Sequence, residues 1–335
     1  MGESPEPIPL TEPVLPGDDE VLRALLRRRE TGSRPGARTD GHRIALVVSG
    51  GGMRGAYAGG MVHALDDAGL GDAFDVVYGS SAGAYIGAAL LLGNGEGAAR
   101  IFFEDMACRE FIDPRRFGTR RPVVSLDHLI GHILTVPKPL PWAELAASPV
   151  PLRVIVTAAD DLTPHVLDPA TPQEWRHALR ATAAIPLLAG PPVELYGRRW
   201  IDGSVSEPLP VLQALRDGAT HVLALLTRTE PELRRTDPGP GPARWARLLD
   251  RVRPGLGAIT QDVARHAPVL AVLDDAAHPD RGGAHLRLVA PARNLGVRGL
   301  TTDVPLVTRA AEVGYETLVA ALREAGDGRT AGVQP

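Results

Sequence analysis

The sequence predicts an α/β fold with a mainly parallel central sheet. Two units of strand, tight loop and helix follow each other, at residues 43–69 and 75–87. Continuous apolar runs at residues 151–159 and 221–226 predict further core strands, because strands buried on both faces lack polar alternation. The 335 residues suffice for one large domain of this class, or two small ones, with a sizeable core.

Composition limits the function classes. Hydrophobic residues make up 44% of the chain and charged residues 23%, which are ordinary values for a globular protein. The net charge of −4 and the pI near 6.2 give no support to nucleic-acid binding as the main function. The single cysteine, Cys108, excludes an intrachain disulfide framework and a cysteine-based zinc cluster. The chain therefore suits a reducing compartment.

We expect a cytoplasmic protein that contacts a membrane from one side at most. The first residues have neither the positive start nor the apolar run of a secretory signal. The longest apolar segment, Ala82 to Leu92, is shorter than the roughly 20 residues that span a bilayer. Residues 18–29 predict a short helix, for which a solvated surface position is favoured over a membrane-touching arm.

The strand predicted at residues 43–49 ends in a glycine-rich loop, Gly50-Gly51-Gly52-Met53-Arg54-Gly55, and a helix follows. Such a loop presents backbone N–H groups to an anion at the start of the helix. The loop also matches the dinucleotide fingerprint, which requires an acidic residue about 20 residues on, at the end of a second strand. Asp72 and Asp75 precede that strand, so a dinucleotide site is disfavoured.

The next strand ends in Gly79-Ser80-Ser81-Ala82-Gly83, a G-x-S-x-G turn before a helix. In this context the serine stands on a strained corner with its hydroxyl exposed, as a nucleophile does, and the flanking glycines allow close packing. The alternative is an ordinary turn in which Ser81 caps the helix. A nucleophile beside a glycine-rich loop is the layout for acyl transfer through a tetrahedral oxyanion.

A nucleophilic serine needs a base. None of the ten histidines has an informative context, and His285, which comes nearest, precedes its predicted strand instead of following it. Asp202 ends the second strand of a hairpin predicted at residues 193–203, and Gly203 permits a sharp turn after it. Asp202 is therefore the preferred candidate, although an Asp-Gly hairpin turn is also common without any function.

The rest of the chain supplies further elements of the fold. These are a strand at residues 165–168, helices at 173–182 and 208–218, a strand at 286–290 and a helix at 304–322. Residues 93–149 are mixed helical and loop segments without a chemical interpretation, and residues 228–243 are expected to be a loop. Trp245 then belongs to an apolar stripe among arginines, for which packing on the protein's own body is favoured over a membrane surface.

Four motifs, in this order and spacing, resemble the patatin-like phospholipase family. They are the glycine loop 50–55, the serine turn 79–83, Ala181-Thr182-Ala183-Ala184-Ile185-Pro186, and Asp202-Gly203-Ser204. The resemblance runs from about Arg43 to Val211, and the chain beyond it is similar to a bacterial branch of the family. It implies a three-layer α/β/α sandwich and a Ser-Asp dyad without a catalytic histidine.

By this resemblance Ser81 is the nucleophile and Asp202 the general base. The implied oxyanion hole is the loop of Gly50, Gly51, Gly52, Met53, Arg54 and Gly55. The implied nucleophile elbow comprises Gly79, Ser80, Ala82 and Gly83, and the implied base turn comprises Gly203 and Ser204. Ser204 stands where the family has glycine or alanine. Because this position mainly has to be small, we expect activity to survive.

The implied function is a serine lipid acyl hydrolase, phospholipase A-like or esterase, that works through an acyl-serine intermediate. Alternatives that stay open are a small-ester or thioester hydrolase or an acyltransferase on the same dyad, and a catalytically idle lipid-binding protein. The expected partners are a lipid or phospholipid substrate and the surface of a membrane, not nucleic acid. Neither a cofactor nor a metal is needed by this chemistry.

Composition and the resemblance together suggest a division of the chain. We expect residues 1–42 to be a disordered arm with a short helix and a linker. Residues 43–325 would form the patatin-like α/β hydrolase domain, and residues 326–335 a polar tail.

Overall fold

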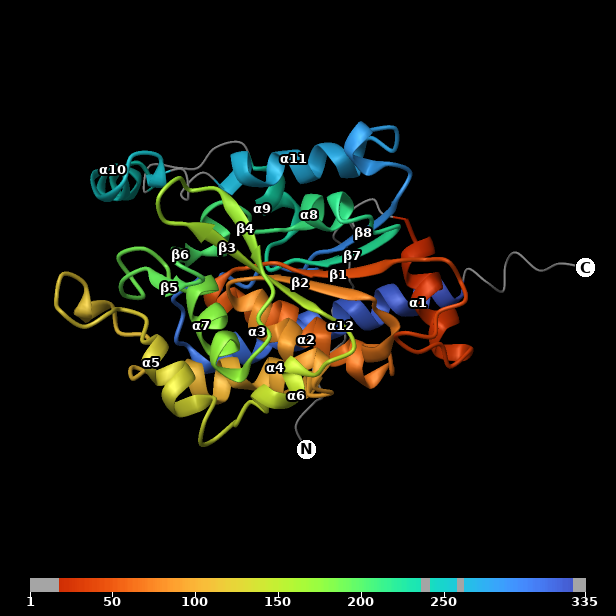
Figure 1. Ribbon diagram of the computed structural model, residues 1–335, viewed down its shortest axis with the longest axis horizontal. Helices are drawn as coiled ribbons and strands as arrows, with labels where there is room; N and C mark the ends of the chain where they lie inside the picture. The colour runs from red at the N-terminus through yellow and green to blue at the C-terminus, as the bar shows by residue number, and fades with distance from the viewer. Residues whose placement is uncertain (1–17, 236–241, 258–261, 328–335) are drawn as a thin grey trace, which may run out of the picture.

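The computed structural model describes residues 18–235, 242–257 and 262–327. These residues form one eight-stranded, mostly parallel sheet with helices on both of its faces (Figure 1). The predicted α/β fold with three layers is confirmed. Residues 1–17 of the expected arm and most of the expected polar tail lie outside the described residues.

The strand order is β5-β6-β3-β2-β1-β7-β8, and β4 pairs with β3 off this path. The strands are β1 (Ile44–Val48), β2 (Val76–Ser80), β3 (Leu152–Ala158), β4 (Pro164–Leu167), β5 (Val193–Leu195), β6 (Arg198–Asp202), β7 (His221–Leu225) and β8 (His285–Val289). Strands β3, β2, β1, β7 and β8 are parallel, whereas β4 and β6 pair antiparallel with β3, and β5 with β6. The carboxyl ends of the parallel strands therefore lie at one end of the sheet.

Side chains of the central strand β1 alternate between two hydrophobic cores. Ile44, Leu46 and Val48 belong to the larger core, while Ala45 and Val47 belong to the smaller core on the other face. Every residue of β1 is buried, which explains its uninterrupted apolar sequence.

The larger core is covered by most of the helices. They are α1 (Glu20–Glu30), α2 (Gly55–Asp67), α3 (Ala82–Leu91), α4 (Gly95–Ile101), α5 (Leu126–His128), α6 (Trp142–Ala146), α7 (Pro172–Thr182) and α12 (Val304–Asp327). The smaller core is covered by α8 (Val211–Arg216), α9 (Glu230–Arg234) and α11 (Asp262–Asp274). Helix α9 lies inside residues 228–243, so the expectation of a loop there is wrong for this part; Thr229 and Glu232 form a capping box that starts the helix.

Helix α10 (Pro242–Val252) has its own small core, in which Leu249 packs with Ile201 and Val205. Shorter helical segments join the other elements. They are η1 (Gly52–Arg54), η2 (Gly71–Ala73), the π-turn η3 (Phe102–Met106), η4 (Pro114–Arg116), the π-turn η5 (Leu129–Ile133), η6 (Gly203–Val205) and η8 (Pro279–Arg281).

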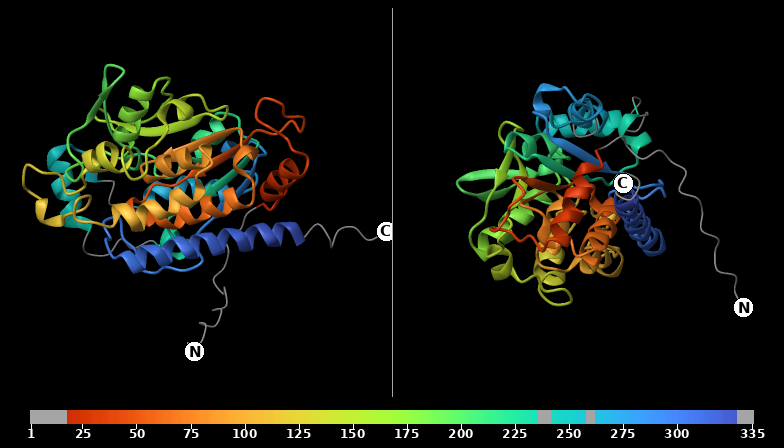
Figure 2. Two further views of the ribbon diagram at one scale, coloured as in Figure 1. Left: turned by 90° about the horizontal axis from the view of Figure 1, so that it is seen from below. Right: turned by 90° about the vertical axis from the view of Figure 1, so that its right-hand side faces the viewer.

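The long helix α12 runs along the helical layer beside α2 (Figure 2). The two backbones approach closely at Gly60 and Gly314. A Cβ atom at Gly60 would lie 1.9 Å from the Ala311 carbonyl oxygen, and one at Gly314 would lie 1.9 Å from that of Tyr57. Only glycine at both positions allows this helix pair to pack.

Helix α1 is part of the folded body, which differs from the expected arm with a solvated surface helix. Val21, Leu22 and Leu25 are fully buried in the larger core. The helix also carries Arg28, whose side chain is only 1% exposed. Helix α1 is buried because its apolar residues recur at helical spacing and form one face. The arginines of its last turn favoured a surface position in the sequence, and that prediction is wrong.

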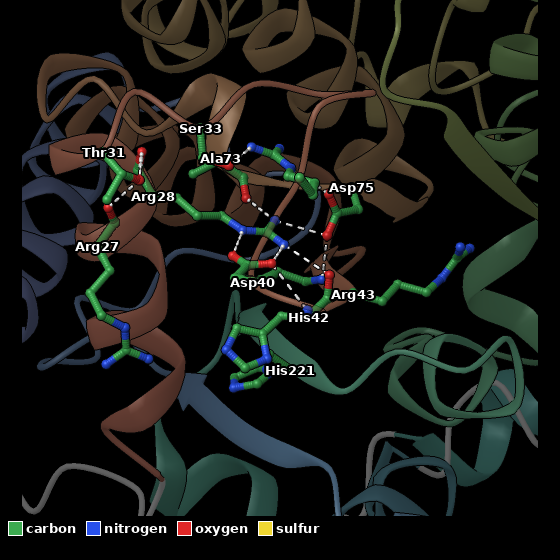
Figure 3. A network of polar contacts seen from close by, with 12 residues as sticks. Arg27, Arg28, Thr31, Ser33, Asp40, His42, Arg43, Ala73, Asp75 and His221 are labelled. Carbon is green, nitrogen blue, oxygen red and sulfur yellow. Dashed lines mark hydrogen bonds and ion pairs between the residues drawn. The ribbon is translucent and has the colours of Figure 1, made fainter.

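The Arg28 guanidinium lies at the centre of a polar network beneath α1 (Figure 3). It donates to Asp40 at 2.6 and 3.0 Å and to Asp75 at 2.8 Å, and also to the carbonyls of Ala73 and His42. The guanidinium holds the pKa of Asp40 well below its usual range. Asp75 in turn accepts from the Ile44 N–H at 2.7 Å, so the network fixes the start of the central strand β1.

We expect Arg28→Ala to lower the free energy of unfolding by roughly 3 to 5 kcal/mol, because two carboxylates would lose their buried partner. Urea unfolding followed by circular dichroism measures this change. The matched control is Arg29→Ala, since Arg29 is exposed and its side chain donates one weak hydrogen bond, to the Ala68 carbonyl at 3.3 Å. Equal losses for both variants would mean that the network does not stabilise the fold.

Candidate active site

Ser81 occupies the sharp corner between β2 and α3. Its backbone has φ 53° and ψ −127°, in a region that favours glycine, and its side chain is 5% exposed. A Cβ atom at Gly79 would lie 2.4 Å from the Ala84 backbone, and one at Gly83 would lie 2.1 Å from the Val48 carbonyl oxygen. The two glycines therefore allow strand and helix to meet at this corner.

The Ser81 hydroxyl donates a hydrogen bond to Asp202 Oδ2 at 2.7 Å. Asp202 ends β6 and is 1% exposed. Its second carboxylate oxygen, Oδ1, accepts from the Ser204 N–H at 2.7 Å in the turn that follows. The two residues singled out as nucleophile and base thus lie in direct contact, although 121 positions separate them in the sequence.

Strand β3 brings these residues together. Ser80 pairs with Ile155, and Asp202 pairs with Val156, the next residue of β3. Because β4 occupies the opposite edge of β3 along the same residues, β2 and β6 share one edge and meet end to end. Close backbone approach at this junction requires Gly203, where a Cβ atom would lie 2.2 Å from the Ile155 carbonyl oxygen.

Two threonines fasten this junction, and the sequence patterns indicated a role for neither of them. The Ser81 N–H donates to Thr182 Oγ1 at 2.8 Å, and the Thr182 hydroxyl donates to the Ile155 carbonyl at 2.5 Å. The Thr157 hydroxyl donates to the Asp202 carbonyl at 2.8 Å. The only sequence feature that could have indicated a role for Thr182 is its place in the Ala181–Pro186 motif. For Thr157 the sequence offers only its place in a buried strand.

Burial raises the pKa of Asp202 to about 6, against the hydrogen bonds from Ser81 and Ser204 and the charge of Arg265, which lower it. A carboxylate removed from water is disfavoured in its charged form, and this makes it a stronger base. At neutral pH Asp202 is still deprotonated.

The glycine-rich loop lies directly over the dyad. A Cβ atom at Gly50 would come within 3.2 Å of the Ser81 Cβ and 2.1 Å of the Ser204 Oγ. The Gly50 N–H donates to the Pro208 carbonyl and the Met53 N–H to the Gly299 carbonyl, both at 3.0 Å. The N–H groups of Arg54 and Gly55 donate within the first helical turn.

Within the described part of the chain, the N–H groups of Gly51 and Gly52 donate to no protein acceptor. They are therefore the loop amides available to a bound group, out of the six-residue loop singled out in the sequence. The Gly299 carbonyl that accepts from the Met53 N–H belongs to residues 291–303. No sequence pattern predicted a role for this segment. Arg54 lines a separate small cavity of about 50 Å³, together with Ser204 and Thr227.

A cavity of about 310 Å³ opens beside Ser81. Its wall contains Ser81, Gly52 and Met53, and the rest is mostly apolar, with Asn94 and Lys138 as polar exceptions. The apolar lining comes chiefly from α3, η3 and the segment 124–141, with Tyr85, Ile86, Ala89, Phe102, Met106, Leu129 and Leu134 among its members. The middle segment of the chain, which had no chemical interpretation from sequence, thus forms most of this cavity.

The histidines considered as a base lie elsewhere. His285 starts β8, at the end of the parallel strands opposite to Ser81, where it stacks on His221 with ring centroids 4.7 Å apart. His128 and His132 stack on each other, also without a hydrogen bond to Ser81. Among the described residues, Asp202 is the one side chain to which the Ser81 hydroxyl donates.

Neither a metal cluster nor a membrane-spanning helix occurs in the described residues. In residues 18–235, 242–257 and 262–327, no group of three or more His, Cys, Asp or Glu side chains is arranged to hold a metal ion. Within the same ranges no helix combines the length and the apolar character needed to cross a membrane.

Comparison with known proteins adds the family. The family model described as "Patatin-like phospholipase" matches residues 46–215, about half of the chain. The chain belongs to the patatin-like phospholipase family. This confirms the resemblance drawn from the four motifs, and the matched residues include both Ser81 and Asp202.

Two individual proteins are similar to this family member. The uncharacterized protein YjjU of Escherichia coli (strain K12) is 31% identical over 200 residues, which are 55% of this chain and 52% of YjjU. The chain thus spans about half the length of this curated relative. The crystal structure of VipD from Legionella pneumophila matches 85% of this chain and 67% of that chain, with 15% identity and a TM-score of 0.46.

We expect Asp202→Asn to raise the free energy of unfolding at pH 8 by on the order of 1 to 3 kcal/mol. The pKa of Asp202 is about 6 in the folded chain and near 3.8 without the fold, so stabilisation by the protonated carboxyl is lost as pH rises through 6. The asparagine does not titrate: its oxygen still accepts from the Ser204 N–H, and its NH2 group donates to Ser81 Oγ in place of the present bond. Urea unfolding at pH 8 and pH 4 measures the difference, which should fall to a small part of its pH 8 value at the lower pH.

The control is Asp127→Asn, because the Asp127 side chain is 81% exposed and its removal should leave stability unchanged at both pH values. A gain at pH 4 as large as that at pH 8 would contradict the raised pKa.

Proposed function

We propose that this protein hydrolyses carboxylic esters of lipids, with Ser81 as nucleophile and Asp202 as general base. The observation that carries the proposal is the 2.7 Å hydrogen bond from the Ser81 hydroxyl to a buried carboxylate, at the wall of an apolar cavity. Family membership supports a lipid acyl hydrolase in general. The contact between Ser81 and Asp202 supports the proposed roles of these two residues.

The first step is acylation. Asp202 Oδ2 accepts the proton as Ser81 Oγ attacks the ester carbonyl carbon, and the carbonyl oxygen becomes an oxyanion. The N–H groups of Gly51 and Gly52 are the donors for this oxyanion. Asp202 then returns the proton to the alkoxide that leaves when the carbon–oxygen bond of the ester breaks. The products are an alcohol and an acyl-serine.

The second step repeats this sequence with water. Asp202 accepts a proton from a water molecule as its oxygen attacks the acyl-serine carbonyl, and the proton passes to Ser81 Oγ when the fatty acid leaves. A carboxylate with a pKa near 6 suits both directions of transfer, since it is deprotonated at neutral pH and more basic than an exposed carboxylate.

The apolar cavity is the natural place for the acyl chain. An apolar cavity of about 150 Å³ holds a benzene ring, so the observed volume holds on the order of a dozen carbon atoms. The cavity measures about 310 Å³, and Ser81 is one of the residues that line it. This geometry favours a medium-chain acyl group over the acyl part of a small ester.

We expect Ser81→Ala and Asp202→Asn each to lower kcat/KM for a medium-chain p-nitrophenyl ester by about 10³-fold or more, because nucleophile and base are lost. Variants of the histidines, His128→Ala and His285→Ala, should retain activity. The wild-type pH profile should rise with a midpoint near pH 6, as Asp202 loses its proton. Release of p-nitrophenol measures all of these rates.

A fluorophosphonate probe provides the control for an active nucleophile. It should label wild type and leave Ser81→Ala unlabelled, with circular dichroism showing that both are folded. An unimpaired Asp202→Asn would reject the base assignment. Wild type that is neither active nor labelled would favour the idle lipid-binding protein. Activity confined to thioesters would favour a thioester hydrolase, and activity confined to acyl transfer would favour an acyltransferase.

The cavity makes a separate prediction about chain length. Ala89 lies on α3 and lines the cavity, so Ala89→Phe should fill part of it. Each methylene group that loses its buried place costs about 0.8 kcal/mol, or roughly fourfold in kcat/KM. We expect the ratio of decanoyl to butyryl ester hydrolysis to fall at least tenfold. The control is Ala143→Phe on the exposed side of α6, which should leave this ratio unchanged.

A further inference from the structure

A second hollow lies near the carboxyl ends of the strands, outside the candidate active site. It has a volume of about 600 Å³ and is formed chiefly by residues 116–122, residues 186–192 and the segment 252–256 at the end of α10. We call these three segments, together with the other residues that line the hollow, the basic end surface. The loop after η4 and helix α10 lie at the same end of the molecule (Figure 1), and the Phe117 and Trp245 rings are 5.6 Å apart.

The charge of this surface is strongly one-sided. Six arginines and one acidic residue line the hollow: Arg116, Arg120, Arg121, Arg180, Arg199, Arg253 and Asp127. Asp127 pairs with Arg180 at 2.7 Å. In the part of the chain that the structure describes, Arg120, Arg121 and Arg199 have no carboxylate within ion-pair distance, although the whole chain carries a net charge of −4.

Apolar side chains project from the same surface, one from each of its three segments. Phe117 is 47% exposed, Leu187 38% and Val252 58%. They are half of the six large hydrophobic side chains that are exposed among the described residues. Apolar groups in water surrounded by basic groups are typical of a face that meets a lipid headgroup layer.

The surface adjoins the candidate active site. Leu126 lines both the apolar cavity beside Ser81 and the hollow of the basic end surface. The segment from Ala183 to Leu187 runs from one to the other, since its first residues line the cavity and its last line the hollow. A lipid surface held here would therefore lie next to the acyl-binding cavity.

We propose that the basic end surface docks this protein on a membrane leaflet that contains anionic phospholipids. The arginines match the phosphate and headgroup charges, and Phe117, Leu187 and Val252 enter the headgroup layer. The preference for lipid over another polyanion rests on the proposed function and on the exposed apolar side chains. Helix α10 takes part with Val252, while its Leu249 remains packed on the body.

Co-sedimentation with vesicles tests this proposal by binding alone. One set of vesicles contains phosphatidylcholine, and the other contains phosphatidylcholine with phosphatidylglycerol. Wild type should bind the second set and not the first, and high salt should weaken the binding. An arginine close to an anionic leaflet contributes roughly fivefold to binding, so Arg120→Glu with Arg121→Glu should weaken it at least tenfold. Phe117→Ser should weaken it several-fold.

The matched control reverses two arginines at the other end of the molecule, Arg34→Glu with Arg323→Glu, for the same change in net charge. Both residues are exposed, on the linker after α1 and near the end of α12. Binding equal to wild type is expected for this variant, and thermal unfolding shows whether each variant is folded.

Three outcomes would overturn the proposal. They are failure of wild type to bind anionic vesicles, wild-type binding by the Arg120/Arg121 variant, and an equal loss in the control. Capture of a DNA fragment in preference to vesicles would also reject it. Running Ser81→Ala in parallel separates this proposal from the proposed function, because docking needs no nucleophile. Vesicle binding without ester hydrolysis would leave docking intact and reject only the catalytic assignment.

Discussion

One edge of β3 is the constraint on which the candidate site depends. It holds the end of β2 at Ile155 and the end of β6 at Val156, so Ser81 and Asp202 are set side by side by backbone pairing. The short side chains of Ser81 and Asp202 therefore reach each other directly. They lose little conformational freedom when they adopt the reactive arrangement. The contacts of Thr182 with Ser81 and Ile155 lock the same junction from the side of α7.

The candidate site contains two features that lower the stability of the folded chain, and the rest of the fold must offset their cost. Ser81 adopts a backbone conformation that costs a non-glycine residue about 1 to 3 kcal/mol. Asp202 keeps a carboxylate away from water, which raises its pKa and lowers stability at neutral pH. Both features serve the proposed chemistry, since one places Ser81 between Asp202 and the apolar cavity and the other strengthens the base. The two hydrophobic cores and the Arg28 network supply the compensating stability.

The two ends of the parallel sheet differ: the amino ends stabilise the fold, and the carboxyl ends carry the cavities. At the amino ends, Arg28 joins α1, the linker and β1 through buried ion pairs, and a stack of histidines covers β7 and β8. At the carboxyl ends, the loops leave an apolar cavity and a basic hollow that share Leu126. Open α/β sheets commonly bind ligands at the carboxyl ends of their strands, because the loops there can vary without changing the core.

Local patterns in the sequence determined the strands, the serine corner and the candidate carboxylate, because apolar runs, glycine spacing and turn residues act within a few positions. Tertiary structure alone decided which loop amides are available, since the Gly299 carbonyl takes the Met53 N–H from almost 250 residues away. It also decided the burial of α1, the pKa of Asp202 and the acyl-sized cavity made from residues 124–141. These properties arise from packing between distant segments, and no short stretch of sequence encodes them.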